Sequence, residues 1–135
     1  MMKSGFIYLH NNIFPTLLAI SSEEQSKGLM YQDWPPPVMS FVYAEPQLNR
    51  FWMKNTPSPL DIVFCCNGII RQINRGDPFS TSIIGDIKSD LVVEFPYGTV
   101  KNANIMIGQQ VGLISPNGDE IKKIIAEKHN YFQKY

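Results

Sequence analysis

Short runs of apolar residues, each closed by proline, glycine or a polar cluster, make up most of the chain. Their length and partial alternation are typical of β-strands. The pattern predicts strands over residues 6–9, 14–20, 38–43, 51–54, 60–66, 69–74, 91–95 and 110–114. Asn67-Gly68 separates two of these runs, and both residues accept the positive φ of a type I′ turn. We therefore expect a β-hairpin there, within a mainly β fold.

Three helices are predicted between and after the strands. Ser21 fits the N-cap of the first, Glu24 falls at its third position as in a capping box, and Gly28 ends it. A second short helix is expected over residues 99–104. The third covers residues 119–135, where isoleucines and a phenylalanine share a face opposite lysines.

Turn-forming residues set the fold class. Ten prolines and nine glycines in 135 residues indicate many short connections, and 44% hydrophobic residues suffice for one buried core. We predict a single-domain β-sandwich or jelly-roll-like barrel with two short helices over residues 1–118. Residues 119–135 would form a C-terminal helical extension.

The charge balance excludes several partners. The formal net charge is 0, which argues against a dedicated nucleic-acid-binding protein and against a polybasic membrane clamp. No apolar run reaches the roughly 18 residues that a membrane span needs. The four apolar residues at 6–9 are too few for the core of a secretory signal, so the expected location is the cytoplasm or a virion.

The usual catalytic and metal-binding motifs are missing from the sequence. Cys65 and Cys66 are neighbours, so on a strand they point to opposite faces and are expected to stay unbridged, one of them in the core. His10 and His129 each lack a nearby companion ligand, which argues against zinc. There is no phosphate loop, dinucleotide fingerprint or nucleophile elbow. We therefore expect no catalytic residue, metal or cofactor.

The segment from Arg50 to Asp61 gathers the most varied side chains in the chain. In one interpretation Trp52, Lys54, Asn55 and Asp61 form a small polar pocket for a sugar or an anion. In the other, Trp52 belongs to the core, Lys54 lies along its indole, Asn55 caps a turn, and Asp61 accepts backbone N–H groups or pairs with a cation. The second interpretation, a structural corner, is favoured.

Glu94 interrupts an apolar run and is the fifth candidate ligand-binding residue. A carboxylate within such a strand must be paired or face outward. If the strands that carry Asp61 and Glu94 were neighbours, the two acids could form a pair for acid–base or metal chemistry. The sequence does not show that they meet.

Several elements, in a fixed order over residues 14–114, resemble one protein family. They are Gly28-Leu29-Met30, Met39-Ser40-Phe41-Val42-Tyr43, Phe51-Trp52-Met53-Lys54-Asn55-Thr56, Pro59-Leu60-Asp61, Val93-Glu94-Phe95-Pro96-Tyr97-Gly98 and Ile107-Gly108-Gln109-Gln110-Val111. The chain is similar to members of domain of unknown function number 192. The resemblance implies a compact β-sandwich or jelly-roll-like barrel with short helices, and no established activity, cofactor or catalytic residue. Members also occur in the genomes of tailed bacteriophages.

Two functional hypotheses follow. The favoured one is a non-catalytic binding or assembly module, in a phage a virion or accessory protein. It would contact copies of itself or other proteins of an assembly through the C-terminal helix and through two loops, Pro35–Pro37 and Arg75–Asp90. The alternative is a receptor or enzyme for a sugar or an anion, which uses the polar side chains of Lys54, Asn55, Asp61 and Glu94.

Overall fold

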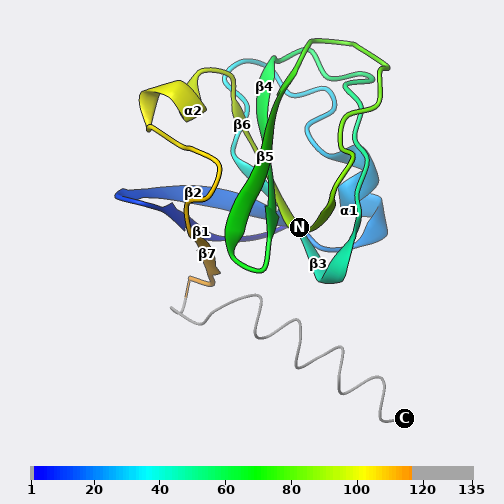
Figure 1. Ribbon diagram of the computed structural model, residues 1–135. Helices are drawn as coiled ribbons and strands as arrows, with labels where there is room; N and C mark the ends of the chain where they lie inside the picture. Colours follow the sequence, from blue (N-terminus) through cyan, green and yellow to red (C-terminus); the bar gives the residue numbers. More distant parts are fainter. Residues whose placement is uncertain (1, 117–135) are drawn as a thin grey trace, which may run out of the picture.

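Seven strands and two short helices form the part of the chain that the computed structural model describes, residues 2–116 (Figure 1). The strands are β1 (Lys3–Leu9), β2 (Asn12–Ala19), β3 (Met39–Leu48), β4 (Leu60–Cys66), β5 (Ile69–Gly76), β6 (Lys88–Pro96) and β7 (Val111–Ile114). The helices are α1 (Ser22–Lys27) and α2 (Thr99–Asn102). The mainly β class and the two short helices are confirmed. The predicted helix over 119–135 lies outside the described residues.

All seven strands belong to one mixed sheet with the order β5-β4-β6-β3-β2-β1-β7. Every pairing is antiparallel except that of β2 with β3. The sheet curls, so that β1 and β2 run across the direction of β4 and β5 (Figure 1). An isolated bridge joins Ile69, in β5 at one end of this order, to Gln110, which directly precedes β7 at the other end. In place of the predicted β-sandwich or jelly-roll-like barrel, all seven strands form a single curled sheet, a half-barrel, and no second sheet stacks on it within the described residues.

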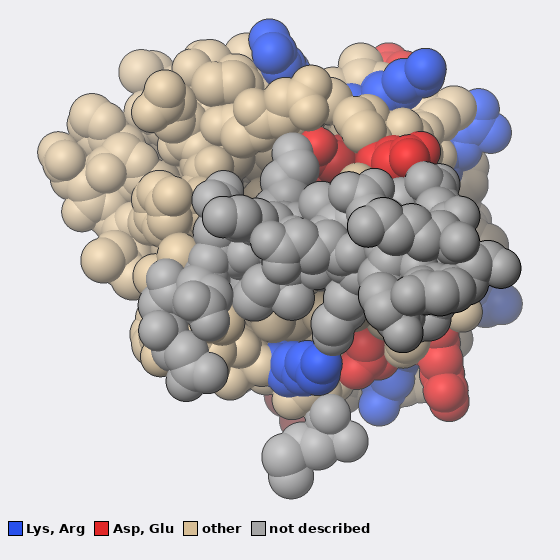
Figure 2. Space-filling view, turned by 90° about the horizontal axis from the view of Figure 1, so that it is seen from below, with Lys and Arg blue, Asp and Glu red and all other residues tan. Residues whose placement is uncertain are grey.

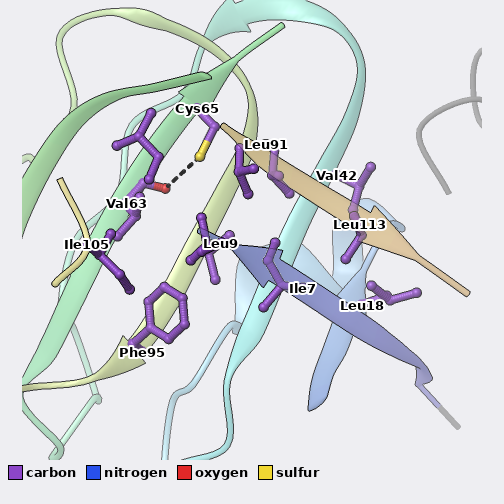
Figure 3. Close-up of a cluster of buried hydrophobic side chains, with 13 residues drawn as sticks. Ile7, Leu9, Leu18, Val42, Val63, Cys65, Leu91, Phe95, Ile105 and Leu113 are labelled. Atoms are coloured by element: carbon purple, nitrogen blue, oxygen red, sulfur yellow. Dashed lines mark hydrogen bonds between the residues drawn. The ribbon is translucent and has the colours of Figure 1, made fainter. Parts of the chain in front are cut away.

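The concave side of the curl holds the larger apolar cluster. Alternate residues of β1, β4, β6 and β7 converge there, among them Ile7, Val63, Phe95 and Leu113 (Figure 3). Cys65 lies in the same cluster, and its thiol approaches the Val63 carbonyl oxygen at 3.9 Å. Because the sheet bends around this cluster, the two ends of the strand order share one core.

A second cluster covers the convex side. The intervening residues of β2, β3, β4 and β6 lie there under the loops that follow α1, β3 and β5. Leu29 and Met53 are buried in it, with relative exposures of 2% and 0%. Burial on both faces explains why the middle of β4 (Ile62–Cys65) and the middle of β6 (Leu91–Val93) are apolar without alternation.

The most local predictions are confirmed. The Ser21 hydroxyl accepts a hydrogen bond from the Glu24 backbone N–H, and the Glu24 carboxylate accepts one from the Ser21 N–H at 3.0 Å, which completes the capping box. Asn67 and Gly68 both have positive φ at the tip of the β4–β5 hairpin. Cys65 and Cys66 are free thiols, of which Cys65 is buried.

Pro15 shows how an interior strand tolerates a proline. It pairs with Phe6 on the β1 side of β2. On the other side, β2 pairs with β3 only over Leu17 to Ala19. Pro15 therefore lies where β2 has a free edge, and its missing N–H costs no hydrogen bond in the sheet.

The surface carries its charges unevenly. In the view from below, lysines, arginines and acids lie mainly toward one side, and much of the remaining visible surface has neither (Figure 2). Among residues 2–116, no helix is long and apolar enough to cross a membrane.

Candidate ligand-binding site

A hollow of about 330 Å³ opens between α1, the second half of β3 and the segment that follows it. We call it the Glu94 pocket. It is lined by Ser22, Gln25, Ser26, Lys27, Gly28, Leu29, Met30, Phe41, Tyr43, Gln47, Asn49, Arg50, Phe51, Trp52, Thr56 and Glu94. Residues from three separate parts of the sequence thus meet over the convex face of the sheet.

Glu94 forms the buried acidic part of this lining. In the sheet it stands opposite Met39 of β3 and Ile62 of β4, so its side chain points to the convex face. It is only 4% exposed. Within the described residues the carboxyl group accepts no hydrogen bond, and burial raises the pKa of Glu94 to about 8. The group is therefore mainly protonated at neutral pH.

Gly28 keeps the space beside this carboxyl group open. It follows α1 with φ 50° and ψ −130°, a conformation that favours glycine. A Cβ at this position would lie 3.3 Å from the Phe41 ring and 3.8 Å from Glu94 Oε1. The end of α1 therefore passes over Glu94 without a side chain of its own between them.

Tyr43 adds a hydroxyl group to the same lining. Its pKa is raised first by burial and second by the nearby charge of Glu94. The phenol thus stays protonated at any physiological pH and can donate a hydrogen bond. The second cause also shows that Tyr43 and Glu94 are close enough to interact electrostatically.

Two cations and a set of amides complete the pocket. Lys27 and Arg50 line it with exposed side chains, and within the described residues neither forms an ion pair. The Asn49 amide donates to the Ser89 carbonyl at 2.9 Å and to its hydroxyl at 2.8 Å, and its oxygen accepts from Gln47 at 2.9 Å. This chain of hydrogen bonds fixes the amide groups on one side of the pocket.

Comparisons with known proteins identify the family. The profile of DUF192, described as "Uncharacterized ACR, COG1430", matches residues 10–113. The chain belongs to the DUF192 family. The comparison with curated proteins finds no match.

Two solved structures of bacterial proteins share the fold. One, from Sinorhizobium meliloti 1021, is described as a candidate transcription regulator. It has 30% identity and a TM-score of 0.77, over 83% of this chain and 95% of that one. The other, from Novosphingobium aromaticivorans DSM 12444, is described as a protein of unknown function. It has 27% identity and a TM-score of 0.74, over 78% of this chain and 82% of that one.

The DUF192 signature segment is split between the pocket and the surface. Trp52 lines the pocket and is 43% exposed, so its predicted place in the core is wrong. Lys54 Nζ lies 5.2 Å from the centre of the Trp52 ring, as its predicted packing on the indole requires. Lys54 and Asn55 are not among the lining residues of the Glu94 pocket. Asn55 instead takes a positive φ of 56° in the turn.

Asp61 has a structural partner on the other face of the sheet. Its Oδ2 accepts hydrogen bonds from the backbone N–H groups of Gly98 and Val100, each at 3.0 Å, at the start of α2. The strands of Asp61 and Glu94 are indeed adjacent. However, Asp61 stands opposite Phe95, one position away from the pair of Ile62 with Glu94. The two carboxyl groups therefore point to opposite faces, and the acid pair considered from the sequence is not formed.

Replacing Asp61 by alanine should destabilise the protein by about 2–3 kcal/mol, because two charge-assisted hydrogen bonds to partly buried backbone are lost. Asp61→Asn should lose less, since the amide oxygen still accepts. Urea denaturation measures both. Asp77→Ala is the control: Asp77 forms a 2.8 Å surface ion pair with Arg75, and its loss should cost about 1 kcal/mol or less. Equal losses for Asp61→Ala and Asp77→Ala would contradict the assigned role.

Four lining residues that matter here were not predicted from the sequence: Lys27, Gly28, Tyr43 and Arg50. Each has an ordinary local explanation, as a helix end, a cap, a strand residue and a loop residue. Gly28 and Tyr43 do belong to the elements that identify the family, which was the one available signal. Within residues 2–116, no group of three His, Cys, Asp or Glu side chains is placed to hold a metal ion.

Proposed function

We propose that this DUF192 protein is a non-catalytic receptor domain that binds a small polar molecule in the Glu94 pocket. One observation carries the proposal. A carboxyl group that is 4% exposed lines an open hollow and receives no hydrogen bond from the described residues. Its oxygens are not among the fully enclosed side-chain atoms that lack a partner in the described residues, so they open onto the hollow, where a ligand can reach them.

The energetics favour a ligand at this position. A carboxyl group that is largely removed from water costs free energy, which a well-packed apolar residue would avoid. Glu94 lies among apolar strand residues, where leucine or valine would fit the pattern of β6. A bound molecule that hydrogen-bonds to Glu94 would recover this free energy as affinity.

The pocket has the size of a small-molecule site. Its volume of about 330 Å³ falls at the lower end of the range of roughly 300–1,000 Å³ for ligand pockets. This suits a molecule about as large as a monosaccharide or an amino acid. Trp52 offers a flat wall, and the amides and hydroxyls offer directional hydrogen bonds.

The composition of the lining supports binding without chemical change. Among its described residues Glu94 is the only acid, and the other titratable side chains are Lys27, Arg50 and Tyr43. General acid–base catalysis on a bound molecule ordinarily employs two groups with separated roles. The one partner considered for Glu94, Asp61, points to the opposite face of the sheet.

A ligand screen by NMR tests the receptor proposal. We expect some member of a library of sugars, organic acids, amines and amino acids to shift the amide signals of Gly28 and Tyr43 and the indole signal of Trp52. Trp52→Ala should weaken binding by about tenfold. Trp34→Ala is the matched control, since Trp34 is 56% exposed and lies outside the pocket. If no compound shifts these signals, or if both variants weaken binding equally, the proposal fails.

An assembly role has separate support at another surface. Tyr31 and Phe79, which are 70% and 62% exposed, lie on two loops that both bond to one turn. The Tyr31 N–H donates to the Asn55 carbonyl at 2.8 Å, and the Phe79 N–H donates to the Thr56 carbonyl at 3.1 Å. Exposed aromatic groups of this kind are enriched at protein interfaces. Light scattering at increasing protein concentration would detect self-association.

A role in a tailed bacteriophage, as a virion or accessory protein, stays a prediction. The description of the S. meliloti relative points to gene regulation. However, a net charge of 0 gives this chain little electrostatic attraction for the phosphates of a nucleic acid.

A further inference from the structure

We infer that the ligand of the Glu94 pocket is a polyol of monosaccharide size that carries one anionic group, a carboxylate or a phosphate. This inference rests on the receptor function proposed above and names the class of its ligand. It draws on the charges, the hydrogen-bonding groups and the one flat wall of the pocket.

The charges of the lining call for an anion. Lys27 and Arg50 are its cations, and within the described residues neither has an acidic partner. Within residues 2–116, Glu94 is the only acid that lines the pocket. Because burial raises its pKa to about 8, it is mainly neutral at pH 7. The lining thus carries two positive charges that form no ion pair within the described residues, and one anionic group on the ligand would complement them.

The uncharged groups call for hydroxyls. A protonated carboxyl group donates one hydrogen bond and accepts others, as does the Tyr43 phenol. Gln47 uses one of its two amide hydrogens to bond Asn49, so the other remains for a ligand. Ser22 and Ser26 add hydroxyls from α1. Each of these groups except the Gln47 amide hydrogen can both donate and accept, which matches the hydroxyls of a polyol.

Trp52 favours a sugar ring over a linear acid as the ligand. Its indole is 43% exposed in the wall of the pocket, and the C–H face of a pyranose ring can stack on such a surface. An amine would fit less well, because it would meet the charges of Lys27 and Arg50. The combination of two free cations, paired donor–acceptor groups and a half-exposed indole favours a sugar acid or a sugar phosphate.

Calorimetry on the full chain at about pH 6 and low salt tests the ligand class. The probes are glucuronate, glucose 6-phosphate, glucose, inorganic phosphate and glucosamine. We expect one or both anionic sugars to bind about tenfold or more tightly than glucose, inorganic phosphate and glucosamine. A preference for glucuronate or for glucose 6-phosphate then distinguishes a carboxylate from a phosphate as the anionic group.

Charge variants test the recognition itself. Arg50→Ala should reduce the preference for the anionic sugar over glucose by about tenfold. Arg71→Ala is the matched control, because Arg71 is exposed on β5 and lies outside the pocket. If both variants reduce the preference equally, a general field effect replaces the proposed contact and the inference fails.

The pH dependence adds a readout that a purely structural role of Glu94 would not give. As the pH rises through about 8, Glu94 becomes ionised and repels the anion, so the wild-type affinity should fall. Lys27, Arg50 and Tyr43 are the other charged or titratable groups of the pocket, and all three are retained in Glu94→Gln. This variant should therefore bind with much weaker pH dependence. Equal pH dependence in both proteins would overturn the inference.

The remaining outcomes separate the two levels of the proposal. Tighter binding of glucosamine, with shifts at Gly28 and Trp52, would overturn the ligand class and leave the receptor function intact. Tighter binding of glucose than of either anionic sugar would do the same. If no compound of any class perturbs the pocket, both the ligand class and the receptor function fail.

Discussion

Raising the pH from 5 to 9 should lower the free energy of unfolding of the wild-type protein by about 4 kcal/mol. The cause is Glu94, whose pKa burial raises from 4.5 to about 8 in the folded state. Between these two values the folded protein holds a proton that the unfolded chain releases. Stability therefore decreases with rising pH by about 1.4 kcal/mol per unit. The stabilising contribution of Glu94 should be fully present below about pH 4.5, and the decrease in stability should level off above about pH 8. Urea denaturation at several pH values measures the change.

Two glutamine variants isolate this effect. Glu94→Gln keeps the shape of the protonated side chain but cannot ionise, so its stability should be nearly independent of pH over this range. It should match the wild type near pH 5 and exceed it near pH 9. Glu23→Gln removes an exposed acid of α1 and should keep the wild-type slope. If Glu94→Gln and the wild type show the same slope, the carboxyl group is solvated in the folded protein.

The pKa of the Glu24 carboxylate is shifted in the opposite direction. Hydrogen bonds from the Ser21 and Ile20 backbone N–H groups lower the pKa of Glu24 below 4.5. Its contribution is present above pH 4.5 and is lost as the pH falls below that value. A titration that begins at pH 5 therefore observes Glu94 without this exposed helix-capping residue.

The features that were predicted correctly from the sequence are set by neighbouring residues. The capping box depends on Ser21 and Glu24, three positions apart, and the hairpin depends on Asn67 and Gly68. In each case the backbone geometry follows from the conformational preferences of a few residues. Such local preferences do not depend on the rest of the chain.

The architecture and the site depend on register between distant strands. Apolar runs such as 91–95 fit a strand buried on both faces, which occurs in a sandwich and equally in a curled sheet covered by loops. A shift of one residue between β4 and β6 decides that Asp61 and Glu94 face opposite ways. Lys27 and Arg50 line the same pocket only because α1 and the end of β3 lie over the same face of the sheet. No local pattern in the sequence contains this information.

Replacing Gly85 by alanine should destabilise the protein by about 3–5 kcal/mol, from positive-φ strain and overpacking together. Gly85 has a φ of 109°, which L-residues rarely adopt. A Cβ there would also lie 2.4 Å from the backbone oxygen of Asn49 and 2.9 Å from the ring of Phe64. The loop cannot easily withdraw, because Ile84 and Phe51 exchange two backbone hydrogen bonds of 2.8 Å beside it. Urea denaturation gives the loss.

Gly108→Ala separates the steric clash from the backbone strain. Gly108 has a similar φ of 95°, but an added Cβ would meet no atom within 4 Å. Its replacement should cost only the strain, about 1–3 kcal/mol. The excess loss in Gly85→Ala then measures how rigidly the loop presses on Asn49 and Phe64. Because Asn49 lines the Glu94 pocket, that rigidity would also hold one wall of the binding site in place. Equal losses for the two variants would show that the loop yields, and that its contact with Asn49 does not fix the pocket.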